Sequence, residues 1–368
     1  MESAVLGADI VTTWIRPDAG RPAAAPRPAP KNPLGTGEYE RRRGGSRIAM
    51  RLLGRRFLVM IPTVLLVSLG VFALAAASPF DPLTAHLGDR YQSATRAQRD
   101  AMTQAYDLDD HWFTAWWKWW GAVFRGDLGW SSTMRQPVAD VIGQRLPFTL
   151  GMSFAALLSA AVIAIVLGAV VGMWRGGLLD RVCTSLAAIL AATPPFVVSL
   201  LLVSAFAVGL GWFPTSGARR PGDGYSLDGL LTHAVLPYLA LTISMIPWLL
   251  LTMRSAVVDA AASDAVRGAR ARGVGGWRLL RGHIVPVSVL PTLALLGTRL
   301  PELIAGAAIV ETVFGWPGLA EALVDSAVAL DFSLLAPLAV GSAVLVLIGS
   351  ALSDVAAVWI DPRIGLRA

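Results

Sequence analysis

The chain has 368 residues, of which 55% are hydrophobic and only 15% are charged, and its formal net charge is +6. Soluble domains usually carry about 25% charged residues, so this composition indicates a membrane protein. Residues 1–56 hold all of the positive excess. Because a nucleic-acid-binding domain needs a basic face on its folded part, we expect no nucleic-acid site.

Cysteine and histidine are too few and too scattered to indicate a metal cluster or a disulfide. Cys183 is the only cysteine, and no two of the four histidines lie at helical i, i+4 spacing. The apolar runs also lack a G-x-S-x-G nucleophile motif. We therefore expect no metal site, no bound cofactor and no catalytic residue, which argues against a membrane enzyme such as an intramembrane protease.

Residues 1–45 are rich in proline, alanine, glycine and arginine. Such a segment cannot bury enough apolar surface to fold alone, so we predict a disordered basic tail. The first apolar run begins only near Phe57, which does not fit a secretory signal peptide. We therefore predict that residues 46–77 form the first transmembrane helix and its flank.

Six apolar runs are long enough to cross a bilayer, which takes about 20 helical residues. The sequence therefore predicts an all-α membrane protein with six transmembrane helices, five of them in a core over residues 148–360. The runs are Phe57–Ala77, 148–173, 182–210, 235–253, Pro286–Glu311 and 335–360.

The positions of the arginines predict the orientation, because segments rich in Lys and Arg stay on the cytoplasmic side. Arginines gather before the first run, between the second and third runs, and between the fourth and fifth runs. They are Arg41, Arg42, Arg43, Arg47, Arg51, Arg55 and Arg56, then Arg175 and Arg181, then Arg254, Arg267, Arg270, Arg272, Arg278 and Arg281. We predict that the tail and residues 361–368 are cytoplasmic and that residues 78–147 are external.

Six of the 13 tryptophans lie within residues 112–130 of this external loop. Tryptophan prefers the membrane–water interface, where its ring is half wet and half apolar. We interpret the segment as an amphipathic helix in contact with lipid at the outer surface. Packing of the indoles against other spans and a stacking platform for a ligand are the alternatives. The residues concerned are Trp112, Trp116, Trp119 and Trp120, with Lys118 and Arg125 within reach of headgroups.

The loop between the fourth and fifth runs, residues 255–285, carries a spaced motif that resembles the EAA loop of bacterial ABC importer permeases. Ala269, Gly273 and Pro286 match that pattern, whereas Arg267, Gly268 and His283 replace its Glu, its first Ala and its Ile. Departures of this kind resemble the dipeptide/oligopeptide branch of the binding-protein-dependent permeases.

Further segments resemble that branch in the same order along the chain, so the resemblance covers about residues 50–365. They are SPFDP (78–82, with Phe80 in place of Gly), YDLDD (106–110), WWGAVFRGDLGWS (119–131, with Asp127), RLPFTL (145–150), LGWFPTSG (210–217), HAVLP (233–237), ETVFGWPGL (311–319) and DPR (361–363).

The resemblance implies a six-helix type I permease in a bacterial cell membrane, coupled to a separate ATPase. Lys31 and Lys118 are the only lysines, and neither lies in a GK[ST] phosphate-binding sequence. ATP and Mg²⁺ therefore belong to two partner ATPase subunits or one fused ATPase. A homologous second permease and an external binding protein complete the implied complex.

We expect the EAA-like loop to dock the ATPase through Arg267, Ala269, Arg270, Gly273, His283 and Pro286. Small Ala269 permits close approach, and Gly273 permits a turn that we expect to be closely packed. Pro286 suits the first turn of the fifth span.

Arg299 and Glu302 are expected near mid-membrane, where unpaired charges are costly and usually functional. Their spacing places them on one helix face, and Pro301 leaves the carbonyl of Gly297 without its helical donor. Together with Glu311 they are candidates for the translocation pathway. A structural ion pair, or a contact with a partner helix, is the alternative.

The resembled branch implies di- or oligopeptide substrates, with nickel chelates, glutathione or another small solute as alternatives. An ion-coupled secondary transporter is a rival of a different class. It would be expected to show internal repeats and mid-membrane carboxylates, and no second half of this chain mirrors the first.

Overall fold

The computed structural model describes residues 36–78, 95–98, 101, 111–219, 222, 224 and 226–360, with the backbone alone for 36–53, 55 and 356–360. The chain divides into two compact units, Met1–Arg43 and Gly44–Ala368, and every contact described below lies within the second. The segments SPFDP, apart from its Ser78, YDLDD and DPR lie outside the described residues, as does most of the predicted tail.

Helices make up most of the described chain, in agreement with the predicted all-α class. The long helices are α1 (Thr36–Ala77), α5 (Val138–Met173), α8 (Leu227–Ala262) and α14 (Phe332–Ile360). The shorter ones are α4 (Trp112–Val123), α6 (Leu178–Ala192), α7 (Pro195–Leu202), α9 (Asp264–Ala271), α10 (Gly276–Leu279), α11 (Val285–Thr298), α12 (Leu300–Phe314) and α13 (Leu319–Val328). Two π-helical turns, η2 (Val203–Gly209) and η3 (Leu280–Ile284), extend α7 and precede α11, and β1 (Trp130–Ser131) pairs antiparallel with β2 (Gln136–Pro137).

Five helical stretches of the described residues are long and apolar enough to cross a membrane, and two bent pairs raise the possible number to seven. The predicted six spans fall inside this range. The five stretches are Arg56–Ala77, Val138–Met173, Leu227–Ala262, Gly276–Thr298 and Phe332–Val355. The bent pairs are α6 with α7–η2 and α12 with α13.

The third predicted span is broken at its two adjacent prolines. Thr193 adopts an extended conformation with ψ of 120°, as is usual for a residue before proline. Pro194 and Pro195 follow, and α6 and α7 diverge by 106°. The run 182–210 is therefore two helices rather than one straight rod.

The fifth predicted span differs from the expected run Pro286–Glu311 at both ends. Its helix reaches back to Gly276, because η3 joins α10 to α11 and the Val285 amide donates to the Leu280 carbonyl across the π turn. Pro286 does lie in the first turn of α11. The helix then breaks at Arg299, since Pro301 cannot donate an i→i−4 hydrogen bond.

Glycines let α5 and α8 approach closely at the centre of the molecule. A Cβ placed on Gly168 would lie 2.7 Å from the Met253 side chain, and one on Gly172 would lie 2.7 Å from Val257. Small residues of this kind commonly bring membrane helices together. Besides α5, the helices α6, α7, α11 and α12 also pack against α8.

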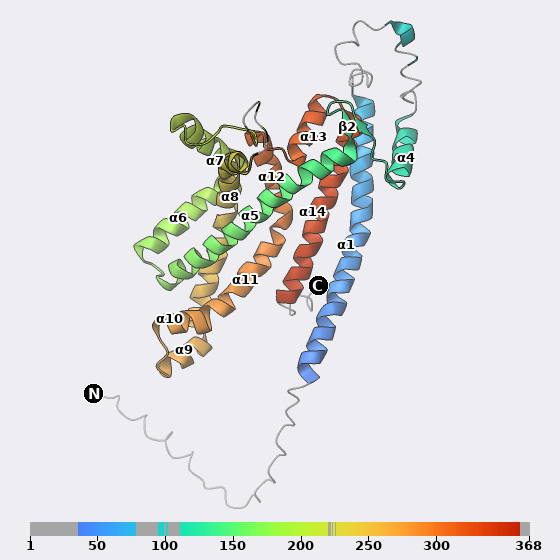
Figure 1. Ribbon diagram of the computed structural model, residues 1–368. Coiled ribbons are helices and arrows are strands. Elements are labelled where there is room, and N and C mark those ends of the chain that lie inside the picture. Colours follow the sequence, from blue (N-terminus) through green and yellow to red (C-terminus); the bar gives the residue numbers. More distant parts are fainter. Residues whose placement is uncertain are drawn as a thin grey trace, which may run out of the picture. The chain divides into compact units, whose positions relative to one another are not determined.

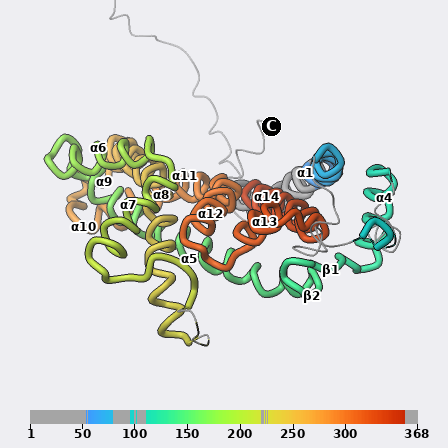
Figure 2. The backbone as a smooth tube through the Cα atoms, turned by 90° about the horizontal axis from the view of Figure 1, so that it is seen from above, coloured from blue at the N-terminus to red at the C-terminus, as the bar shows by residue number. Residues whose placement is uncertain are grey.

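The first helix lies at one side of the helical array, between α14 and α4 in both views (Figures 1 and 2). Only 6% of the most apolar part of its span, Arg56–Ala77, is buried inside this chain, so most of its surface is left for lipid or a partner. Arg56 pairs with Asp354 of α14 at 2.6 Å. On its other side, Ser68 accepts a hydrogen bond from Trp116 of α4.

The helices carry different structures at their two ends (Figure 1). One end, here named the loop end, holds α9 and α10. The other, the hairpin end, holds β1, β2 and α13. Asp331, which is 1% exposed, fixes the hairpin to the start of α14, since it accepts hydrogen bonds from the Ser131 hydroxyl at 2.7 Å and the Thr133 amide at 3.0 Å.

Candidate functional site

The EAA-like loop is a short helix that is anchored on one face and exposed on the other. This helix, α9, begins just after Ser263, and the Ser263 hydroxyl caps it by accepting a hydrogen bond from the Val266 amide. Val266 and Ala269 are buried in a cluster that also contains Val257 of α8 and Ile284. Movement of α9 is thereby tied to α8 and to the helix that leads into α11.

The opposite face of α9 is basic and exposed. Arg267 and Arg270 both lie on it, and Arg267 forms an ion pair with Asp264 one turn earlier. A surface pair of this kind adds little stability. The two arginines therefore leave a charged, accessible surface beside the buried Ala269.

Gly273 ends α9 in the left-handed conformation, with φ of +83°. The Gly273 amide donates to the Arg270 carbonyl at 2.9 Å, and the Val274 amide donates to the Ala269 carbonyl at 3.1 Å. A Cβ at Gly273 would meet no atom within 4 Å. The expectation of a closely packed turn is therefore wrong, and glycine is needed for its backbone conformation instead.

The remaining predicted loop residues lie on the helix that follows. His283 is half-buried in η3, and its Nδ1 has no hydrogen-bond partner in the described part of the chain. Pro286 is exposed at the start of α11. The structure thus brings Arg267, Ala269, Arg270 and Gly273 together on α9 and its turn, while His283 and Pro286 lie further along the chain.

Sequence reasoning missed Trp277, which projects from α10 beside α9. Its side chain is 70% exposed, although tryptophan is usually well buried. An exposed indole next to a basic helix is typical of a protein-binding surface. A lone tryptophan in a loop otherwise rich in glycine and arginine was the available signal.

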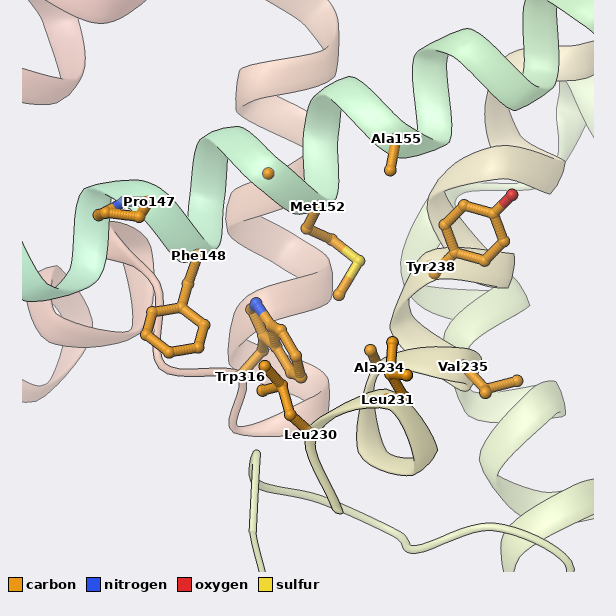
Figure 3. A pocket seen from close by; sticks show the side chains of 11 residues that line it. Pro147, Phe148, Met152, Ala155, Leu230, Leu231, Ala234, Val235, Tyr238 and Trp316 are labelled. Atoms are coloured by element: carbon orange, nitrogen blue, oxygen red, sulfur yellow. The ribbon is translucent and has the colours of Figure 1, made fainter. Parts of the chain in front are cut away.

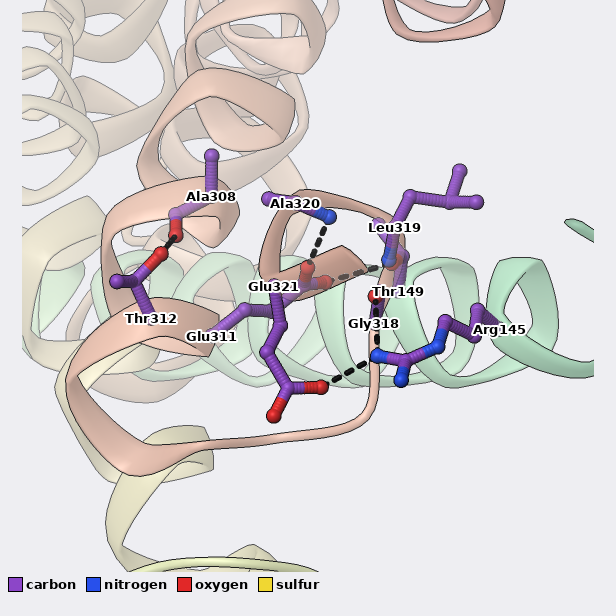
Figure 4. Close-up of polar contacts among 9 residues, drawn as sticks. All are labelled: Arg145, Thr149, Ala308, Glu311, Thr312, Gly318, Leu319, Ala320 and Glu321. Atoms are coloured by element: carbon purple, nitrogen blue, oxygen red, sulfur yellow. Dashed lines mark hydrogen bonds and ion pairs between the residues drawn. The ribbon is translucent and has the colours of Figure 1, made fainter. Parts of the chain in front are cut away.

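At the hairpin end, a buried carboxylate fastens the elbow, residues 315–318, between α12 and α13. Glu311 is 2% exposed. It accepts a hydrogen bond from the Thr149 hydroxyl of α5 at 2.6 Å and another from the Ala320 amide at 2.9 Å (Figure 4). The Thr149 oxygen in turn accepts the Leu319 amide at 2.9 Å.

A second contact holds the rim of the same elbow to α5. Arg145 donates to the Gly318 carbonyl at 3.3 Å and forms an ion pair with Glu321 (Figure 4). A Cβ on Gly318 would overlap the Glu311 carboxylate, so only glycine fits there. Glu311 is thus enclosed by the elbow and α5, and a place for it on the translocation pathway stays a prediction.

An open apolar cavity of about 490 Å³ lies between α5 and α8 beside this elbow. Phe148 and the 4% exposed Trp316 form part of its wall with ring centroids 5.7 Å apart (Figure 3). Tyr238 also lines it and donates a hydrogen bond to Ser159 at 2.6 Å. Such walls can hold an apolar group, and the one hydroxyl among them, that of Tyr238, is already bonded to Ser159.

Arg299 and Glu302 form the ion pair that their spacing predicts. The Arg299 guanidinium also lies over the Trp248 ring of α8, 4.8 Å from its centroid. Pro301 stands between the paired residues at the start of α12. The pairing does not distinguish a pathway role from a structural one.

The tryptophan segment forms the predicted helix, α4, but three of its indoles face α1. Trp116 is 8% exposed, and its Nε1 donates to Ser68 at 2.9 Å, while that of Trp120 donates to the same oxygen at 3.2 Å. Trp119 packs against Phe72 with the two rings tilted and their centroids 5.8 Å apart. Packing against another span, the alternative considered above, therefore describes these three residues, and a position at the lipid surface stays a prediction.

Asp127, a predicted residue of the external loop, shapes a turn. The exposed Asp127 accepts the Gly129 amide at 2.9 Å and so shapes the turn before β1. Among the described residues, no group of three or more His, Cys, Asp and Glu side chains could hold a metal ion.

Comparison with known proteins identifies a matching family and relatives that agree with it. Residues 164–366 match the family described as binding-protein-dependent transport system inner membrane component. The chain is 32% identical over 312 residues to the oligopeptide transport system permease protein AppB of Bacillus subtilis (strain 168), an alignment that covers 84% of this chain and 98% of AppB.

Two Escherichia coli (strain K12) proteins are similar to nearly the same extent. The probable D,D-dipeptide transport system permease protein DdpB is 31% identical over 317 residues, covering 80% of this chain and 91% of DdpB. The glutathione transport system permease protein GsiC is 31% identical over 278 residues, covering 76% and 87%. The family match covers more than half of the chain, and the alignment with AppB spans almost the whole of that relative. The chain therefore belongs to the binding-protein-dependent transport system inner membrane components, the permease subunits of ABC importers.

Proposed function

We propose that this permease forms half of the translocation pathway for di- or oligopeptides in a bacterial cell membrane. The names of AppB and DdpB, which align along most of the chain, support peptides as the substrate class. An external binding protein delivers the peptide, and a homologous second permease supplies the other half of the pathway. The family assignment favours this importer over an ion-coupled secondary transporter.

The observation that carries the coupling role is the geometry of α9 and α10. An importer must pass movement from an ATPase to its spans, and α9 is fixed to α8 through Val266 and Ala269 while its basic face stays exposed. Trp277 extends that exposed surface. ATP and Mg²⁺ act on the partner, as two ATPase subunits or one fused ATPase.

The arginine distribution supports a cytoplasmic position for the loop end. Arg267, Arg270, Arg272, Arg278 and Arg281 all belong to this end. The hairpin end, with residues 78–147, then faces outward, where the binding protein docks. Both termini lie on the cytoplasmic side in this arrangement.

Uptake by the reconstituted complex tests the proposal. Proteoliposomes that contain the permease with its co-purified partners and binding protein should accumulate labelled peptides of two to six residues only when ATP is enclosed on the ATPase side. An ionophore that collapses ion gradients should leave the initial rate unchanged. Uptake that follows an ion gradient without ATP, or no uptake of any peptide, would contradict it.

Glutathione is the second candidate, because GsiC is as similar to this chain as DdpB is. Glutathione is itself a small peptide-like anion, so the same assay decides between the two. A rate for glutathione well above the rates for ordinary di- and tripeptides would favour it, and a nickel chelate provides the comparison with a non-peptide solute.

A further inference from the structure

Three side chains from two helices meet at the break between α11 and α12. Arg299 contacts Glu302 through its Nη1 atom and lies over the indole of Trp248, 4.8 Å from the ring centroid. The 14-residue α11 ends just before Arg299, and the 15-residue α12 begins just after it, at Leu300. Each helix is about 21–23 Å long at about 1.5 Å per residue. Taken as one crossing, as in the predicted fifth span Pro286–Glu311, α11 and α12 place the cluster far from both ends of the helical path, near the middle of a hydrocarbon core about 30 Å thick.

The cluster is open on the surface of the isolated chain. The Glu302 side chain is 50% exposed, and Trp248 is 43% exposed. A charged group facing lipid at this depth is costly, so charged side chains in spans turn toward a protein interior or a water-filled cavity. This face of α8 and α12 is thus covered by something other than lipid.

The interruption of the helix is a second feature that does not fit a surface facing lipid. Backbone that leaves the helical pattern at membrane depth is tolerated where it is buried in protein or lines a water-filled space. In secondary transporters, which face the same problem of moving a polar solute through the bilayer, interrupted helices commonly form the substrate site. Arg299 is the residue at the interruption, with φ of −89° and ψ of −7°.

The chemistry of the cluster fits a carboxylate ligand. A guanidinium binds carboxylates through paired N–H donors, and stacking on an aromatic ring fixes its plane. Trp248 supplies the ring, and Glu302 supplies a carboxylate that already occupies one edge of the guanidinium. Because Glu302 is half exposed and on a flexible side chain, an incoming carboxylate can take its place.

We propose that Arg299 binds the carboxylate of a peptide in transit, that Glu302 is the resident carboxylate which the substrate displaces, and that Trp248 keeps the guanidinium oriented. This inference rests on the proposed peptide transport. It assigns opposite effects to the two halves of one ion pair. Arg299 attracts the substrate, whereas Glu302 competes with it.

The test compares tri-alanine as the free acid and as the C-terminal amide. The initial uptake rate of each peptide is measured in proteoliposomes with excess binding protein. For each variant, the rate for the acid is divided by the rate for the amide to give the acid-to-amide ratio. Because every variant uses the same binding protein, its own preference cancels. Arg299→Gln should lower the ratio about tenfold, the value of one charge-assisted hydrogen bond. Glu302→Gln should raise the ratio about threefold or more.

The control is Asp354→Asn, which removes the charge of the α1–α14 pair and should leave the ratio within twofold of wild type. If wild type moves no detectable amide, the acid rates per assembled complex are compared, and Arg299→Gln should be about tenfold slower than Asp354→Asn.

The inference would be overturned if the acid-to-amide ratio changed in the same direction in both variants, if it did not change, or if the variants only failed to assemble. Any of these results would favour a structural pair or a contact with the second permease. In the acid-only comparison, an Arg299→Gln rate equal to that of Asp354→Asn would do the same. If the wild-type complex moves no peptide at all, the proposed function fails instead, so the two failures are distinguishable.

Discussion

Single glycines and one buried carboxylate determine the shape of both functional ends. Glu311 is shielded from solvent yet accepts hydrogen bonds from α5 and from the start of α13. Buried polar groups need such partners, since leaving them unpaired costs several kcal/mol. Gly318 leaves the space that the carboxylate fills, and Gly273 provides the left-handed turn at the opposite end.

Gly318→Ala should destabilise the elbow, because its methyl group would overlap the Glu311 carboxylate. Overpacking of this kind typically costs about 1–3 kcal/mol. Thermal unfolding of the purified complex should therefore shift downward by several degrees. Gly341→Ala in α14 is the matched control, since its methyl group meets no atom within 4 Å. Equal stability of the two variants would show that the carboxylate moves aside freely.

The loss of co-purified ATPase in Gly273 variants should follow the backbone preference of the new residue and not its size, because the space around Gly273 is open. Asparagine tolerates the left-handed region, whereas β-branched residues do not. Gly273→Asn should retain most of the co-purified ATPase, and Gly273→Val should lose most of it, with a cost of at least about 1–2 kcal/mol. Equal ATPase recovery from both would contradict the role given to the +83° φ angle.

At the scale of elements, long apolar runs predicted the spans, whereas the bends between α6 and α7 and between α12 and α13 emerged only in the structure. The sequence did not reveal that α5 begins at Val138, because its first turns mix polar residues with Val138 and Val141, which are buried against Leu319 and Leu334. Hydropathy detects membrane contact, and this part of α5 contacts other protein elements. The same limit concealed the inward orientation of α4, since the acceptor Ser68 lies in a distant helix.

Ser68→Ala should loosen α4 from α1, because Ser68 accepts hydrogen bonds from both Trp116 and Trp120. The loss of two such bonds amounts to about 1–3 kcal/mol. Tryptophan emission should shift to the red, and proteolysis near α4 should accelerate. Thr63→Ala is the control, since the Thr63 hydroxyl bonds only within its own helix, to Val59. The same spectral change in both variants would contradict the docking of α4.

For the whole molecule, the order of motifs predicted the family and the position of the loop. The side chains that contact the site residues from other helices were not predictable. Trp248, Thr149 and Arg145 reach Arg299, Glu311 and Glu321 only through tertiary packing. A spacing rule cannot connect residues on separate helices. Asp180 and Arg254 give another example, since their bidentate pair at 2.6 and 2.7 Å joins α6 to α8 near the loop end.

The central claim is that the loop end couples this permease to a cytoplasmic ATPase, and site-directed cross-linking tests it most directly. In a variant whose half-buried Cys183 is replaced by alanine, Arg270→Cys is treated in membranes with a thiol-to-amine cross-linker, beside Ala139→Cys at the hairpin end. Arg270→Cys should yield a product that contains the ATPase, and Ala139→Cys should yield none. Cross-linking of the ATPase from Ala139→Cys, or its absence from Arg270→Cys in an assembled complex that transports, would contradict the account.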